Sequence, residues 1–342
     1  MRLPSAPQQD FAGSVAAVLA KHDPLAGMRQ AVGPRVLDRG LWRELERLGL
    51  LEPAAEGDLL TACLVAETLG RHAAPLPYLS AVVANALVAG AGGTPEGLLT
   101  YGLLDAQGTW TVSVTYRDGR ISGTLPFVPD ADVADGVVIL ADTADGPALA
   151  VVPLAEAQVT ALQSLDGTQP IGRVTLDDVP ASLLPAAPDL GAARNLALAA
   201  HSASLLGLMS WLLDTTVAYA GQRIQFGMPI AARQAVKHRC ASMLIGIESS
   251  RAMVWELADA VEHGADDADL TAATTMAWVT ETAEEVAAGA LQLHGGIGFT
   301  WEHDLHHYFK RCTVGALLLG SAAHHRAAVA ALLRSRTASS VG

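Results

Sequence analysis

The change of hydrophobic period along the chain constrains the fold most. Apolar residues recur at helical spacing up to about residue 100, alternate with a period of two from about 101 to 184, and then return to helical spacing in four long runs. The alternating part contains Asp118-Gly119, a strong hairpin signal. The predicted fold is α+β and mainly α: an N-terminal helical domain (1–100), a small central antiparallel β domain (101–184) and a C-terminal four-helix bundle (185–342).

Composition narrows the class of protein. The 342 residues carry a formal net charge of -13, which argues against binding of nucleic acid. No continuous apolar run reaches the roughly 18 to 20 residues of a membrane span, and the N-terminus has no secretory signal, so we expect a cytoplasmic protein. Cys63, Cys240 and Cys312 have no CxxC spacing, which fits reduced thiols and no metal or disulfide framework.

The connection between the first two bundle runs, RIQFGMPI (223–230), contains more charged, amide and aromatic side chains than a turn needs. Gly227 and Pro229 account for a bend. Arg223 adds a permanent cation, Phe226 adds a ring, and Gln225 adds an amide, as Gln234 does shortly afterwards. These groups predict a ligand contact, although Arg223 could instead cap a helix and Phe226 could pack in the core.

A second candidate segment, QLHGG, follows the third bundle run. Gly295 and Gly296 would let the backbone come close to a ligand, and Gln292 and His294 flank them. A glycine that ends the helix is the alternative, and one glycine can serve both purposes.

These motifs, together with LWRELERLGLL near the N-terminus, resemble the acyl-CoA dehydrogenase family over nearly the whole chain. The resemblance implies the family's fold and FAD-dependent oxidation of an acyl-CoA thioester to the 2-enoyl-CoA. It also implies that FAD, held mainly by a neighbouring subunit, is contacted by Arg223, Gln225, Phe226, Gly227, Gln234, Gln292, His294, Gly295 and Gly296. In that setting Arg223 would pair with the pyrophosphate.

The chain departs from the family where a base should remove the α proton. Most members place a Glu before a Gly-Thr or Gly-Ser pair, and here Leu319 precedes Gly320 and Ser321. Other members use the first bundle helix, where this chain has Ala197 and Leu198. No catalytic residue is therefore predicted in this chain.

Two further features bear on the missing base. The nearest proton acceptor on the first bundle helix is His201, which we expect to be a satisfied core histidine. The family's flavin- and substrate-binding loop is also absent or much shortened between Gly97 and Gly123.

A chain without base and loop resembles the short subunit of bacterial α2β2 members. The resemblance then implies a larger homologue as partner, which would supply the base, and by analogy a steroid-derived or other bulky acyl-CoA. Three alternatives stay open: a homo-oligomer, a structural subunit without flavin, and a non-redox enzyme acting on a thioester.

Further polar residues are assigned structural roles. His303, His306 and His307 have a spacing that could hold a metal, but no metal site is predicted. Glu302 and Asp304 are expected to pair with Lys310 or Arg311. We expect His324 and His325 to face solvent or a subunit interface.

Overall fold

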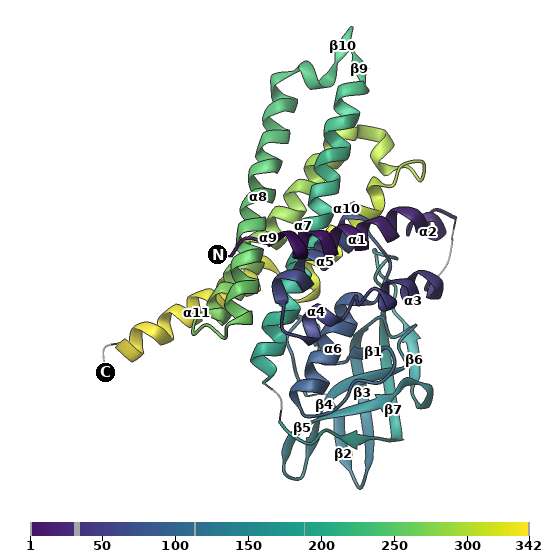
Figure 1. Cartoon of the computed structure of the whole chain (residues 1–342), viewed down its shortest axis with the longest axis vertical. Helices are drawn as coiled ribbons and strands as arrows, with labels where there is room; N and C mark the ends of the chain where they lie inside the picture. Colours follow the sequence, from purple (N-terminus) through teal and green to yellow (C-terminus); the bar gives the residue numbers. More distant parts are fainter. Residues whose placement is uncertain (1, 31–34, 113, 188, 341–342) are drawn as a thin grey trace.

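The computed structural model describes residues 2–30, 35–112, 114–187 and 189–340. Within these residues, helices form both ends of the chain and a sheet forms the middle, as predicted (Figure 1). The N-terminal helices are α1 (Ala6–His22), α2 (Ala26–Gln30), α3 (Arg39–Arg47), α4 (Glu52–Ala55), α5 (Leu59–Arg71) and α6 (Tyr78–Gly90). Periodicity predicted α3, α5 and α6 individually. The domain limits at 100 and 184 stay a prediction.

The described strands of the middle region form one main sheet. Its order is β6-β7-β3-β2-β4-β5-β8, with β1 beside β4. The strands are β1 (Leu99–Tyr101), β2 (Val114–Arg117), β3 (Arg120–Pro129), β4 (Gly136–Thr143), β5 (Gly146–Pro153), β6 (Gln158–Ala161), β7 (Ile171–Pro180) and β8 (Ser182–Leu183). Most pairings are antiparallel, as expected, but β4 pairs in parallel with both β1 and β2.

The hairpin predicted at Asp118-Gly119 joins β2 to β3. Arg117 pairs with Arg120, and both turn residues have positive φ, 50° and 81°. Positive φ at both central positions matches the right-handed twist of the strands, which is why Asp-Gly is such a strong signal.

The C-terminal bundle is built from α7 (Leu190–Gln222), α8 (Gln234–Glu262), α9 (Ala268–His294), α10 (Leu305–Leu318) and α11 (Ala322–Ser340). The prediction of a single fourth helix over 312–335 is wrong. Gly320 has φ of 100°, which helical backbone cannot adopt, so the chain turns between α10 and α11. Leu319, the residue at the position of the family base, lies in this break between the two helices.

Helix α7 is the core of the bundle. Two segments, Leu190–Gln222 and Leu305–Thr337, are long and apolar enough to cross a membrane. Judged by length and mean hydropathy, the expectation that no run is long enough is therefore wrong. However, 89% of the apolar window of α7 is buried inside the protein. The second segment is interrupted at Gly320. The absence of a membrane span stays a prediction.

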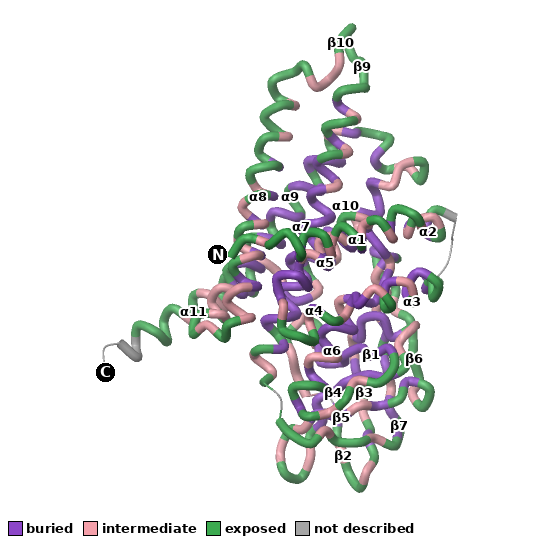
Figure 2. The backbone as a smooth tube through the Cα atoms, in the orientation of Figure 1, coloured by how far each residue is buried: buried purple, intermediate pink, exposed green. Residues whose placement is uncertain are grey.

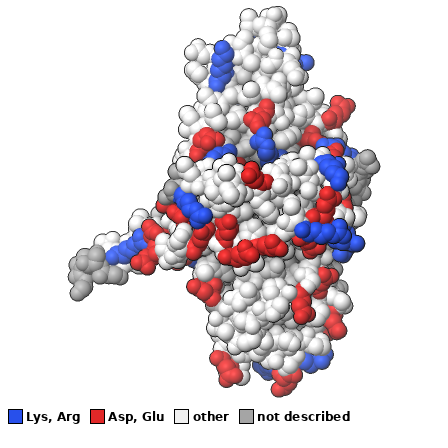
Figure 3. Space-filling model, viewed as in Figure 1, with Lys and Arg blue, Asp and Glu red and all other residues white. Residues whose placement is uncertain are grey.

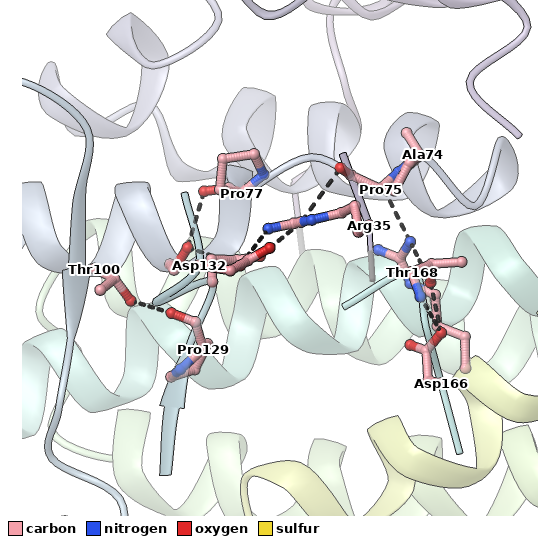
Figure 4. Close-up of polar contacts among 12 residues, drawn as sticks. Arg35, Ala74, Pro75, Pro77, Thr100, Pro129, Asp132, Asp166 and Thr168 are labelled. Carbon is pink, nitrogen blue, oxygen red and sulfur yellow. Dashed lines mark hydrogen bonds and ion pairs between the residues drawn. The ribbon is translucent and has the colours of Figure 1, made fainter. Parts of the chain in front are cut away.

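A buried polar network fixes the N-terminal helices against the sheet (Figure 4). The Arg35 guanidinium, with a side chain 0% exposed, donates to Asp130 Oδ1 at 2.8 Å and to Asp132 Oδ1 at 2.9 Å. Ser80 in α6 donates to the other oxygen of Asp130 at 2.6 Å. Burial raises the pKa of Asp130, and Arg35 opposes that shift. The network thus holds a charge pair away from water at the point where β3 ends.

Candidate flavin surface and reactive-centre cavity

The two predicted ligand-contacting segments lie at the same end of the bundle (Figure 1). The amide of Arg223 donates to the Tyr219 carbonyl at 2.8 Å. The Tyr219 ring stacks on His294, with centroids 4.5 Å apart, and its hydroxyl donates to the His294 carbonyl at 3.3 Å. Because His294 directly precedes Gly295, these contacts join the end of α7 to the glycine turn after α9.

Arg223 and Phe226 both lie on the exposed surface of this chain. Between α7 and α8 the chain forms a small hairpin from β9 (Ile224–Gln225) and β10 (Met228–Pro229), followed by a 3-10 turn (Ile230–Ala232). Arg223 is exposed and has no ion pair among the described residues. Phe226 is 89% exposed, with the Arg233 guanidinium 5.0 Å from its ring centroid. Phe226 therefore does not pack in the core of this chain.

The glycine turn is both a helix end and an open surface. Gly295 has φ of 64° and ψ of -140°, a conformation restricted to glycine, and its amide donates to the Leu291 carbonyl. A Cβ at Gly295, Gly296 or Gly227 would meet nothing within 4 Å. Backbone groups of another molecule can therefore approach these positions closely.

The other residues predicted for this surface divide into two groups. Gln225, Gln234 and Gln292 are exposed, whereas His294 is buried beneath the turn. Nδ1 of His294 lies 2.9 Å from the Ala290 carbonyl, and its Nε2 has no partner among the described residues. Burial lowers the pKa of His294, so the ring is neutral at neutral pH. His294 therefore packs under the turn, and its predicted contact with FAD stays a prediction.

The positions of the family base meet at a second site, between the sheet and the bundle. Leu319, Ala197 and Leu198 line one cavity of about 390 Å³, although more than 100 residues separate them along the chain. Its other lining residues are Gly108, Thr109, Trp110, Arg194, Asn195, Asp269, Ala273, His324, His325, Ala328, Ala331 and Leu332. The structure thus brings together both positions predicted for a base, and neither carries an acid.

Asp269 is the acid that lines this cavity, and sequence analysis missed it. Its Oδ1 accepts from Arg194 Nη2 at 3.1 Å and from Asn195 Nδ2 at 2.7 Å. Both contacts hold the side chain in place at the start of α9. Only the fold brings Asp269 to α7, because the two helices are far apart in sequence.

The loop between β1 and β2 packs against the α10–α11 joint. Asp105 Oδ1 accepts from the amides of Gln107 and Thr109, each at 2.8 Å, and so closes a tight turn. A Cβ on Gly108 would lie 2.8 Å from the Leu319 carbonyl carbon and closer still to the Gly320 amide nitrogen. The turn therefore lies directly on the joint that carries Leu319.

Two histidines near this joint are satisfied within the core. Nε2 of His201 lies 2.7 Å from the Gly315 carbonyl, which confirms the prediction for this residue. Nε2 of His325 lies 3.0 Å from the Leu319 carbonyl and this residue is buried within the chain, so the expectation that it faces solvent or a subunit interface is wrong. Burial lowers the pKa of each to about 4. Neither ring carries a charge at neutral pH.

The histidines around the start of α10 lie against one another with their rings tilted. His306 and His307 have ring centroids 4.0 Å apart and are both buried, and no cluster among the described residues has the arrangement of a metal site. Asp304 accepts from Arg29 Nε at 2.7 Å and from Nη2 at 2.6 Å. The expected pairing of Asp304 with Lys310 or Arg311 is therefore wrong, because α2 supplies the cation.

Comparison with known proteins identifies the class that this fold and these two sites define. A family model described as "Acyl-CoA dehydrogenase, C-terminal domain" matches residues 195–333. The chain is 34% identical over 327 residues to "Acyl-CoA dehydrogenase IpdE2" of Mycobacterium tuberculosis, covering 93% of this chain and 94% of that relative. The chain therefore belongs to the acyl-CoA dehydrogenase family, which confirms the resemblance seen in its motifs.

Solved structures similar to this chain include two that are each named for a pair of proteins. A variant of the "Tcur3481-Tcur3483 steroid ACAD" matches with a TM-score of 0.86 and 28% identity, over 97% of this chain and 99% of that chain. The "ChsE4-ChsE5 complex from Mycobacterium tuberculosis" matches with a TM-score of 0.86 and 27% identity, over 98% of this chain and 99% of that chain.

Proposed function

We propose that this chain is the base-deficient subunit of a heteromeric, FAD-dependent acyl-CoA dehydrogenase. One observation carries the proposal: both family base positions, Leu319 and Ala197–Leu198, line a single cavity and neither is an acid. The acid that does line it, Asp269, has its Oδ1 held by Arg194 and Asn195. The proton at the α carbon of a thioester needs a base poised near neutral pH, and an aliphatic side chain cannot accept it. The larger partner subunit would supply that base.

The opposite end of the bundle fits FAD. Arg223 is an exposed cation suited to a pyrophosphate, and Gln225 and Gln292 are exposed amides on the same two segments. Gly295 and Gly296 leave the backbone open to close approach. When bound, FAD accepts the hydride from the β carbon of the substrate. The residues of this chain would bind and orient it and exclude water, with Phe226 covering an apolar edge.

The partner and the substrate class rest on the relatives. Two similar structures are named as assemblies of two proteins, and one of these is named a steroid ACAD. These names support a heteromer acting on a steroid-derived or other bulky acyl-CoA, and hence a role in lipid metabolism. Cytoplasmic location is part of the same proposal, and cell fractionation would test it.

Co-expression with a longer homologue tests the proposal. We expect a colourless protein when the chain is produced alone and a yellow complex, reducible by an acyl-CoA, when the two are produced together. A yellow protein that reacts when the chain is produced alone would reject the base-deficient assignment. A colourless complex would favour the structural or the non-redox alternative.

Replacing Arg223 by alanine should reduce flavin retention without unfolding the chain. Charge-assisted hydrogen bonds contribute about 1.5–3 kcal/mol, so we expect the dissociation constant of FAD to rise roughly tenfold or more. Fluorescence titration of the deflavinated complex with FAD measures this. Arg47→Ala is the control, because Arg47 is also an exposed arginine but lies on α3. Equal FAD affinity in the two variants would remove Arg223 from the site.

A further inference from the structure

The end of the bundle that carries the hairpin differs in charge from the rest of the protein. Residues 221–247 contain four cations, Arg223, Arg233, Lys237 and Arg239, and no Asp or Glu, in a chain whose net charge is -13. None of the four has an ion pair within the part of the chain that the structure describes, whereas Arg29, Arg35, Arg71 and Arg251 are all paired. Figure 3 shows blue and no red at this tip.

The same segment is exposed and partly apolar. Met243 is the first buried residue after Ala220, so the hairpin and the upper part of α8 stand free (Figure 2). The large apolar side chains exposed along it are Ile224, Phe226, Met228, Leu244 and Ile245. Apolar groups beside charged ones are the composition of a protein interface, and a monomer rarely leaves such a patch uncovered.

From this charge pattern we infer that the chain covering this arm (residues 221–247) presents an acidic face to it. The inference rests on the proposed heteromer and adds the chemistry of the contact. A flavin pyrophosphate would occupy Arg223, but Lys237 and Arg239 lie on α8 beyond the hairpin and stay unmatched. A second copy meeting this arm with its own arm would oppose cations with cations. An acidic face on a different subunit neutralises them and covers the apolar side chains as well.

The kinetics of assembly test this inference with Lys237→Glu. Association with the purified larger subunit is measured by stopped-flow without FAD, at about 50 and about 500 mM NaCl, where screening differs strongly. We expect the wild-type rate to fall with salt, and the variant to associate roughly tenfold more slowly at low salt. That difference should largely disappear at high salt, and the melting temperature should stay unchanged because Lys237 is exposed.

Arg47→Glu is the matched control, since it makes the same change in net charge on α3. A wild-type rate independent of salt, or equal slowing in both variants, would overturn the inference. The inference would also be overturned if the wild type sedimented with anionic phospholipid vesicles and Lys237→Glu did not, because the arm would then bind a membrane surface. If the chain assembles only with itself, the proposed heteromer is rejected. The salt dependence of the self-association rate then tests whether the face that covers the arm is acidic. A chain that stays monomeric beside its partner contradicts both.

Discussion

Replacing Gly207 by alanine should lower the free energy of unfolding by about 3 kcal/mol or more. Gly207 lies where α7 crosses α5. An added Cβ would be 2.6 Å from the Arg71 amide nitrogen and closer still to the Glu67 carbonyl oxygen. Both atoms belong to helical backbone, which cannot move aside as a flexible side chain could. The two helices must separate, and the core contacts between them weaken.

Urea denaturation of both the wild type and the variant measures this effect. Gly13→Ala is the control, because Gly13 also lies within a helix, α1, but a Cβ there meets nothing within 4 Å. In the control, the better helix propensity of alanine should leave stability unchanged or raise it by up to about 1 kcal/mol. If both variants unfolded at the same urea concentration, α5 and α7 would not be packed as closely as described.

Replacing Arg35 by leucine should destabilise the protein by about 3–5 kcal/mol at pH 7, because Asp130 would stay buried without its cation. The loss should depend on pH. Burial already raises the pKa of Asp130 in the folded protein, and removal of Arg35 takes away a group that opposes that shift. A carboxyl whose pKa is raised on folding favours the folded state at low pH and disfavours it as pH rises through the folded pKa. The penalty should therefore be smaller at about pH 4.5 than at pH 7.5.

Urea midpoints of wild type and Arg35→Leu at the two pH values check this prediction. A second variant, Arg35→Leu with Asp130→Asn, removes the charge and should recover part of the stability at pH 7.5. An equal penalty at both pH values, with no recovery in the double variant, would show that Arg35 acts through packing alone and that Asp130 is not the group left unpaired.

Local sequence signals predicted the exposed Arg223 connection and the open Gly295 turn better than the cavity lined by Leu319. Arg223, Phe226 and the Gly295 turn each lie in a short connection, where glycine and a free cation are informative without knowledge of the rest of the fold. The burial of His294 beneath the turn was not predictable in this way, because it depends on Tyr219 from another helix. Whether these residues hold FAD stays a prediction for the experiments above.

By itself, the sequence determined the order of helices, sheet and bundle, the Asp118-Gly119 hairpin, and the lack of an acid at Leu319 and Ala197–Leu198. These depend on periodicity, turn chemistry and residue identity, which are local properties. Only the tertiary structure decided that both base positions line one cavity, that Asp269 joins them, and that Arg29 pairs with Asp304. Such contacts join residues far apart in the chain, and core packing selects them from many pairings that the local pattern allows equally well.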